Sequence, residues 1–79
     1  MNTDFEWDER KSKSNFEKHG VTFYDAQKAF FDNNRVIAED LDHSTVGEKR
    51  YFCFGKLKEE ILTVRFTYRD NIIRIIGAG

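Results

Sequence analysis

Basic and polar side chains that can act on a phosphate fall into two groups in this sequence. The first group, Lys11, Lys18 and His19, lies near the N-terminus. The second group lies in the C-terminal half and consists of Arg50, Arg65, Thr67, Arg69 and Arg74. Cationic side chains suit phosphate because they carry several N–H donors, and the guanidinium fork binds two oxygens at once. Phosphate chemistry is therefore the first chemistry to consider.

Cleavage of RNA without a metal ion needs only a few such groups. A base, either an amine or a neutral imidazole, takes the proton from a 2′-hydroxyl, cations stabilise the phosphorane, and an acid protonates the leaving oxygen. Lys18 or His19 can serve as the proton-transfer group. Arg50, Arg69 and Arg74 can contact the phosphate and its transition state. The alternative is that these arginines only form surface ion pairs, and the spacing leaves both interpretations open.

The overall charge does not indicate a nucleic-acid binder, whereas its distribution is more informative. The chain has 79 residues, which predicts one domain over residues 1–79, and its formal net charge is −1. Residues 9–19 and residues 61–79 each carry a net charge of +2, and residues 33–48 carry −3. Two basic segments therefore flank an acidic one.

The cysteine and histidine content predicts neither a disulfide nor a bound metal or other cofactor. Cys53 is the only cysteine and lies in a strand-like run, so we expect a small buried hydrophobic side chain. No Cys/His cluster suggests zinc. His43 with Glu39, Asp40 and Asp42 can be drawn as a metal site, but a polar loop explains these residues without a metal.

The N-terminal residues are acidic and lack the apolar core of a signal peptide. No stretch approaches the roughly 20 apolar residues that a membrane span needs. We therefore expect a cytoplasmic protein with no membrane partner.

The hydrophobic pattern predicts an α+β fold with the element order β-α-α-β-β-β-β. A short strand at residues 5–7 precedes a helix over residues 9–19. A second helix begins at Thr22, which forms a variant capping box with Asp25, and ends near residues 32–34. The apolar period then changes from about 3.6 to 2, which predicts four strands. These strands span residues 35–41, 50–57, 61–68 and 72–76. Their short connections favour an antiparallel meander with the helices on one face.

The helix predicted over residues 9–19 is polar nearly all round. Asp8 and Gly20 are suitable as its caps, and Phe16 is its only large apolar residue. We expect Phe16 and the caps to hold the helix to the domain, while its basic residues face outward toward a partner. The alternative is a solvated helix whose lysines have no specific role.

The stretch FEWDERKSKSNFEKHGVTF, residues 5–23, resembles the opening of the BrnT family of type II toxin–antitoxin ribonucleases, which are RelE-like in fold. That family begins with Trp-Asp, a Lys three residues later, an Asn, and then Lys-His-Gly-Val and Phe. The matching positions here are Trp7, Asp8, Lys11, Asn15, Lys18, His19, Gly20, Val21 and Phe23. Further matches are Ala26, Phe30, Asp32, Arg50, Gly55, Thr67, Arg69, Arg74, Ile75 and Ile76, so the resemblance covers nearly the whole chain.

The resemblance implies a cytoplasmic bacterial toxin that cleaves RNA and stops translation. It also implies a BrnA-type antitoxin with a DNA-binding, ribbon–helix–helix domain, with toxin–toxin contact in a heterotetramer. On this basis Lys18, His19, Arg50, Arg69 and Arg74 are the expected catalytic residues. Lys11, Arg65 and Thr67 are the expected RNA-phosphate contacts.

The end of the sequence departs from the family pattern. The family usually ends its last strand with Ile-Ser-Ala-Arg and continues into a basic C-terminal helix. Here Gly77, Ala78 and Gly79 stand in place of Ser-Ala-Arg, so we expect that helix to be missing. This departure keeps an alternative open, a catalytically weak or inactive module that pairs with a DNA-binding antitoxin and modulates transcription.

Overall fold

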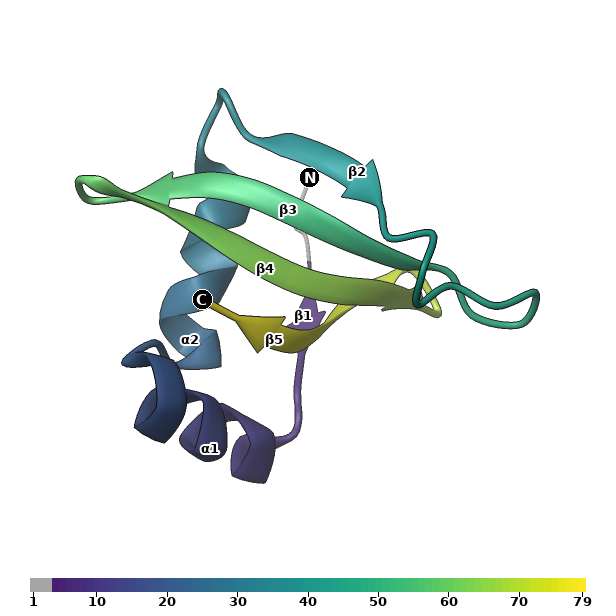
Figure 1. Ribbon diagram of the computed structural model, residues 1–79, viewed down its shortest axis with the longest axis horizontal. Coiled ribbons are helices and arrows are strands. Elements are labelled where there is room, and N and C mark those ends of the chain that lie inside the picture. The colour runs from purple at the N-terminus through teal and green to yellow at the C-terminus, as the bar shows by residue number, and fades with distance from the viewer. Residues whose placement is uncertain (1–3) are drawn as a thin grey trace.

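The computed structural model describes residues 4–79 and has helices on one face of a mostly antiparallel sheet. The helices are α1 (Glu9–His19), α2 (Phe23–Ala26) and the 3-10 helix η1 (Gln27–Phe31). The strands are β1 (Phe5–Glu6), β2 (Val36–Glu39), β3 (Arg50–Leu57), β4 (Glu60–Arg69) and β5 (Ile72–Ala78) (Figure 1). The predicted α+β class and element order are confirmed. The RelE-like relationship stays a prediction.

The sheet contains five strands, because the N-terminal strand joins the four-stranded meander. The strand order is β1-β5-β4-β3-β2, and β1 pairs parallel to β5 with Phe5 opposite Ile73. Phe5 also packs edge-to-face against Phe30, with ring centroids 5.2 Å apart. This aromatic contact between distant residues holds β1 in place, and the local sequence pattern does not reveal it.

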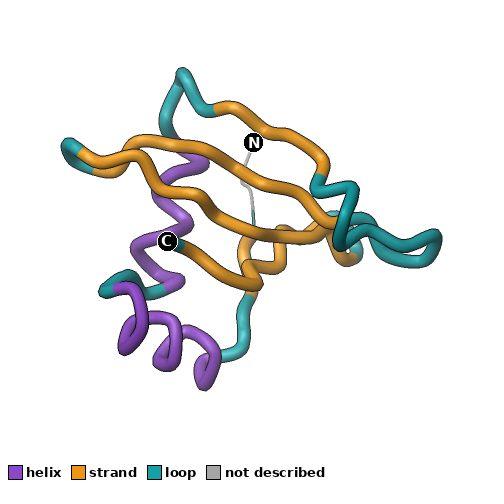
Figure 2. Tube along the Cα trace, in the orientation of Figure 1, coloured by secondary structure: helices purple, strands orange, loops and turns teal. Residues whose placement is uncertain are grey.

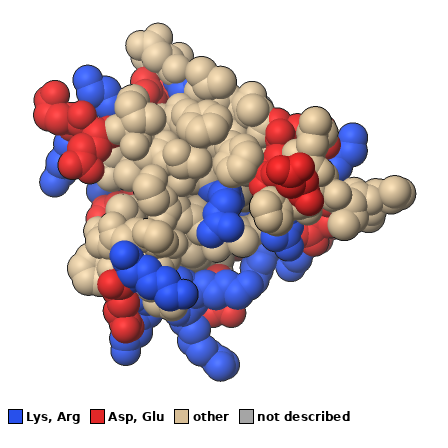
Figure 3. Space-filling view, viewed as in Figure 1, with Lys and Arg blue, Asp and Glu red and all other residues tan. Residues whose placement is uncertain are grey.

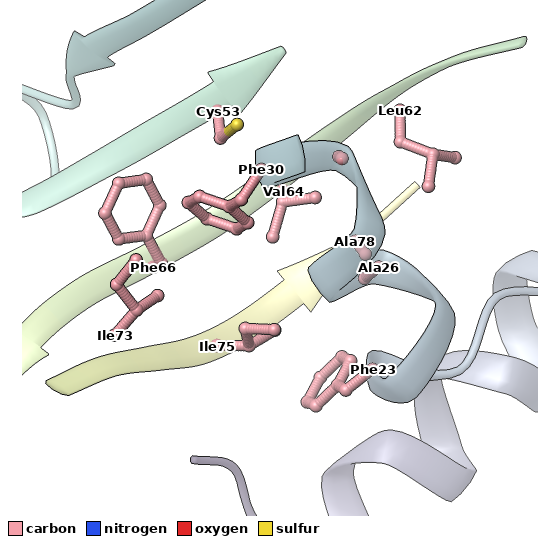
Figure 4. Close-up of a cluster of buried hydrophobic side chains, with 11 residues drawn as sticks. Phe23, Ala26, Phe30, Cys53, Leu62, Val64, Phe66, Ile73, Ile75 and Ala78 are labelled. Carbon is pink, nitrogen blue, oxygen red and sulfur yellow. The ribbon is translucent and has the colours of Figure 1, made fainter. Parts of the chain in front are cut away.

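The core lies between α2, η1 and the inner face of the sheet (Figure 2). Phe23 and Phe30 from the helical layer meet Val64, Phe66 and Ile75 from the strands (Figure 4). The edge-to-face contact of Phe30 with Phe66, at 5.0 Å between centroids, lies in this core. Apolar burial is the main stabilising contribution in a domain of this size, so this layer fixes the sheet against the helices.

The second helix begins as predicted and then tightens. The Thr22 hydroxyl accepts a hydrogen bond from the Asp25 N–H at 3.1 Å, which caps the first turn. After Ala26 the helix continues as the 3-10 segment η1. Along η1, the backbone of Ala29 packs so closely on Gly55 of β3 that any side chain at Gly55 would collide with it. The glycine in the strand therefore marks a close backbone approach.

Polar side chains hold α1 on the domain. The Ser12 hydroxyl accepts from the Phe23 N–H at 2.9 Å. The Asn15 amide donates to the carbonyls of Val21 and Ala78, both at 2.9 Å, and accepts from the Ala78 N–H at 3.2 Å. Phe16 is 53% exposed, so the expectation that Phe16 anchors this helix is wrong. The physical reason is that buried backbone groups beside α1 need partners, and Ser12 and Asn15 supply them.

Candidate active site

Four arginines surround Thr67 on the face of the sheet that the helices leave open. Across the ladders, Thr67 of β4 pairs with Arg50 of β3 and with Arg74 of β5. Arg65 and Arg69 lie two residues before and after Thr67 on β4, and residues at this spacing share a face. Since neighbouring strands lie about 4.8 Å apart, all four Cα atoms lie within about 7 Å of Thr67. We call Arg50, Arg65, Arg69 and Arg74 the arginine cluster.

The alternation of β4 is what brings the arginine cluster onto the open face. Val64 and Phe66 are buried and point toward the helices, so Arg65 and Thr67 point away from them. Figure 3 shows this open face, with Lys and Arg atoms at its centre and along its lower side and with Asp and Glu atoms toward its left and right edges. Arg50 and Arg74 lie on the neighbouring strands, on either side of Thr67.

Two glutamates contact the arginine cluster. Glu48 accepts from Arg50 Nε at 3.2 Å, and its other carboxylate oxygen lies 3.9 Å from Arg69. Glu6 accepts from Arg74 at 2.9 Å. The ion pairs considered in the sequence therefore exist for these three arginines. They are partly exposed, and such pairs contribute only about 0–1 kcal/mol, so a phosphate can replace the carboxylates. Because four arginines face two glutamates, the site has a net positive charge.

Arg65 has a different environment from the rest of the cluster. The β4–β5 ladder shifts register between Arg65 and Phe66, so Gly77 comes opposite Arg65 and Ile75 opposite Phe66. The Arg65 guanidinium lies directly over Gly77, in the space that a side chain there would fill. Sequence reasoning missed Gly77 as part of this site, although a glycine inside a strand is a signal of close approach.

The loop between β2 and β3 is tied to the first arginine of the cluster. The Asp40 N–H donates to the Arg50 carbonyl at 2.7 Å. The Ser44 hydroxyl accepts from the Arg50 N–H at 2.8 Å and donates to the Asp40 carbonyl at 2.7 Å. Thr67 is 2% exposed and its hydroxyl donates to the Lys49 carbonyl at 2.7 Å. Thr67 therefore holds the end of this loop on β4, at the centre of the cluster.

The same loop carries a histidine–carboxylate pair. His43 Nδ1 lies 2.8 Å from Asp40 Oδ2. The His43 side chain is 61% exposed, whereas the Asp40 side chain is 8% exposed. Within residues 4–79, no group of three or more His, Cys, Asp or Glu side chains is arranged to hold a metal ion. Sequence reasoning considered these residues either as metal ligands or as an ordinary polar loop.

The basic residues of α1 form a separate group. Lys11, Lys18 and His19 are exposed, as predicted. Helix α1 contacts β5, and the His19 ring lies near Gly79, which follows that strand. Within residues 4–79, no ion pair joins these side chains to the arginine cluster. The structure thus divides the predicted site residues between the open sheet face and α1.

Cys53 does not belong to the site. Its side chain is buried on the inner face of β3, and burial raises the pKa of its thiol to about 11. A thiol with such a raised pKa stays protonated near neutrality and is a poor nucleophile.

The pKa values of two carboxyl groups elsewhere in the chain are lowered. Backbone N–H donors lower the pKa of Asp8 at the start of α1 and the pKa of Asp32 beside β3.

Comparison with protein families places residues 7–79 in the class of ribonuclease toxins of type II toxin–antitoxin systems. The chain belongs to the BrnT family, whose model is described as "Ribonuclease toxin, BrnT, of type II toxin-antitoxin system". A search of curated proteins found no match. The family match confirms the resemblance seen in the opening motif. In the described residues no helix is long and apolar enough to cross a bilayer.

Proposed function

We propose that this chain is a cytoplasmic endoribonuclease that cleaves RNA without a metal ion and thereby inhibits translation. The observation that carries the proposal is the arginine cluster around Thr67 on an open sheet face. An RNA phosphate at this position would receive guanidinium donors from three strands at once. Such preorganised donors act most strongly on the extra charge of a phosphorane, which is how they would accelerate cleavage.

The roles of the individual side chains follow from their positions. Arg50, Arg69 and Arg74 would contact the reacting phosphate, exchanging their carboxylate partners for its oxygens. Arg65 would contact a neighbouring phosphate along the same face. Lys11, Lys18 and His19 lie on α1, and we assign them to RNA that extends past β5 or to a protein partner.

Family membership supports a partner protein as well as an RNA target. A toxin of a type II system is paired with an antitoxin, and we propose a BrnA-type protein with a ribbon–helix–helix domain. The toxin–toxin contact in a heterotetramer belongs to the same proposal. An antitoxin that supplies carboxylates to the arginine cluster would replace Glu6 and Glu48 and block RNA.

The ion pairs of Arg50, Arg69 and Arg74 also favour a second candidate function. If the two glutamates remain bound to these arginines, the site is closed to phosphate. The chain would then act only as a module that binds its antitoxin and modulates transcription.

Incubation of the purified protein with total RNA in EDTA distinguishes the two functions. The endoribonuclease proposal predicts cleavage that survives EDTA and is lost in Arg69→Ala. Arg35→Ala, which removes an arginine outside the cluster, is the matched control and should cleave like the wild type. Strong inhibition by EDTA contradicts the metal-free mechanism. No cleavage by folded protein, with or without ribosomes, favours the binding module.

A further inference from the structure

The Asp40–His43 pair has the geometry of a base held by a carboxylate. The 2.8 Å contact joins His43 Nδ1 to a carboxylate oxygen. Because a carboxylate only accepts hydrogen bonds, this contact puts the imidazole proton on Nδ1 and leaves the lone pair on Nε2. Asp40 is nearly buried and His43 is mostly exposed, so the free nitrogen is accessible from solvent. A buried carboxylate that fixes the tautomer of an exposed histidine is a recurring catalytic arrangement.

The register of the sheet places this pair beside the arginine cluster. Glu39 pairs with Tyr51, so Asp40 comes next to Arg50, and its N–H donates to the Arg50 carbonyl at 2.7 Å. By the alternation of the strands, Asp40 and Arg50 share the open face. His43 is followed directly by Ser44, whose hydroxyl bonds to the Arg50 backbone. Contacts of Asp40 and of Ser44 therefore anchor the His43 loop to the backbone of Arg50, one arginine of the cluster.

The two histidines of the chain lie at different parts of the sheet. His43 belongs to the loop that joins β2 to β3, whereas His19 lies on α1, which contacts β5. In the strand order β1-β5-β4-β3-β2, the loop of His43 adjoins β3, which carries Arg50. The helix of His19 instead contacts β5, which carries Arg74. The Asp40 carboxylate orients His43, whereas within residues 4–79 no side chain forms a hydrogen bond with the His19 ring. The loop between β2 and β3 also carries the charged residues Asp42, Glu48 and Lys49, and Arg50 follows at the start of β3.

Given the RNA cleavage proposed above, we propose that His43 is its general base and that Asp40 is the residue that positions it. His43 Nε2 takes the proton of a 2′-hydroxyl while that oxygen forms a bond to the phosphorus held by the arginine cluster. The bond from phosphorus to the 5′-oxygen breaks, and this oxygen takes a proton from water. The products are a 2′,3′-cyclic phosphate and a 5′-hydroxyl, and the imidazolium returns its proton to solvent.

Single-turnover cleavage of one oligoribonucleotide in EDTA tests the role of His43. His43→Ala should lower the rate at least about 100-fold, the usual contribution of a general base. Its affinity for a 2′-deoxy analogue that cannot be cleaved should stay within about twofold, as expected for an exposed side chain. Added imidazole should restore part of the rate. Val46→Ala, a change at a fully exposed residue of the same loop, should cleave like the wild type.

Asp40→Asn tests the positioning role, since asparagine has nearly the same shape and allows the loop to fold. We expect kcat to fall about 10-fold or more with KM unchanged, and the pH profile of the rate to change, because an amide does not fix the tautomer. If His43→Ala cleaves RNA as fast as the wild type, the inference is overturned and the proposed function still stands. An unchanged Asp40→Asn would remove the positioning role. Absence of wild-type cleavage would overturn the proposed function itself, and the inference with it.

Discussion

Glu48 and Glu6 keep the arginines of the site in place before any ligand arrives. Glu48 contacts Arg50 and Arg69, and Glu6 contacts Arg74. Isolated arginines on a surface sample many rotamers, whereas ion pairs restrict the side chains of Arg50, Arg69 and Arg74. The cost of displacing the carboxylates is small, because partly exposed ion pairs contribute only about 0–1 kcal/mol. The two glutamates therefore orient the cluster and also compete with RNA for it.

Removal of the Glu48 charge should strengthen RNA binding. Glu48→Gln frees the charge of Arg50 and Arg69, so the affinity for an uncleavable oligonucleotide should rise by up to about fivefold, as expected for about 1 kcal/mol. Fluorescence anisotropy measures this affinity. Glu59→Gln makes the same charge change in the exposed β3–β4 turn and should alter the affinity less. An equal increase in both variants would show a general charge effect.

At the scale of elements, α1 is attached by hydrogen bonds where most helices use an apolar stripe. Asn15 satisfies backbone groups of both Val21 and Ala78, which links α1 to the start of α2 and to β5. This explains why a nearly all-polar helix stays on a small domain. The outward face is left free for the lysines that we assign to RNA or a partner.

Substitution of the two α1 residues should separate these contributions. Asn15→Ala leaves buried backbone groups without partners and should lower the free energy of unfolding by about 2–3 kcal/mol. Phe16→Ala removes a half-exposed ring and should cost less than about 1 kcal/mol. Urea denaturation measures both. A larger loss for Phe16→Ala than for Asn15→Ala would contradict the hydrogen-bonded attachment.

Two glycines of the sheet should respond differently to the same change. Gly55→Ala would bring its new methyl group onto the Ala29 backbone, which cannot move without displacing η1, so we expect a loss of about 2–3 kcal/mol or more. Gly77→Ala meets only the end of the Arg65 side chain. It should cost less than about 1 kcal/mol in stability, because a flexible side chain can shift. Thermal unfolding of both variants tests the difference, and equal losses would contradict it.

Sequence patterns predicted the individual elements well where the signals are local. The caps of α1 are enough to predict the helix over residues 9–19. The alternation of apolar and polar residues along β4 is enough to predict that its arginines point outward. The place of β1 in the sheet, the role of Asn15 and the register shift opposite Arg65 depend on contacts between distant residues. Periodicity carries no information about such contacts. The sequence pointed to Asp40 and His43 only as metal ligands or a polar loop, because their proximity to Arg50 depends on the β2–β3 register.

At the scale of the whole molecule, a net charge of −1 coexists with a local cluster of arginines on the open face of the sheet. The arginine cluster gathers charge from three strands, and Glu6 and Glu48 form ion pairs with three of its members. The composition alone therefore does not reveal this local concentration of positive charge. The match of residues 7–79 to a family of ribonuclease toxins is consistent with this local cluster of arginines, which the net charge of the whole chain does not reflect.

RNA binding by this face should depend strongly on salt. Each phosphate that a cation neutralises on a single strand contributes about −0.7 to the slope of log K against log salt, so up to four arginines predict a slope of about −2 to −3. Titrations of the 2′-deoxy oligonucleotide between low and physiological salt give this slope. Arg65→Ala removes one phosphate contact, so the slope should become less steep by about 0.7. Affinity that is independent of salt would contradict electrostatic binding by the cluster.

The most direct test of the central claim is the single-turnover cleavage of one oligoribonucleotide in EDTA by wild type, Arg74→Ala and Arg35→Ala. If the cluster around Thr67 is the active site, the wild type cleaves without a metal ion. Arg74→Ala then loses at least about 100-fold in rate, the usual cost of one transition-state donor. Arg35→Ala stays within about twofold, as a surface change away from the site should. Equal rates for the two variants would place the chemistry elsewhere.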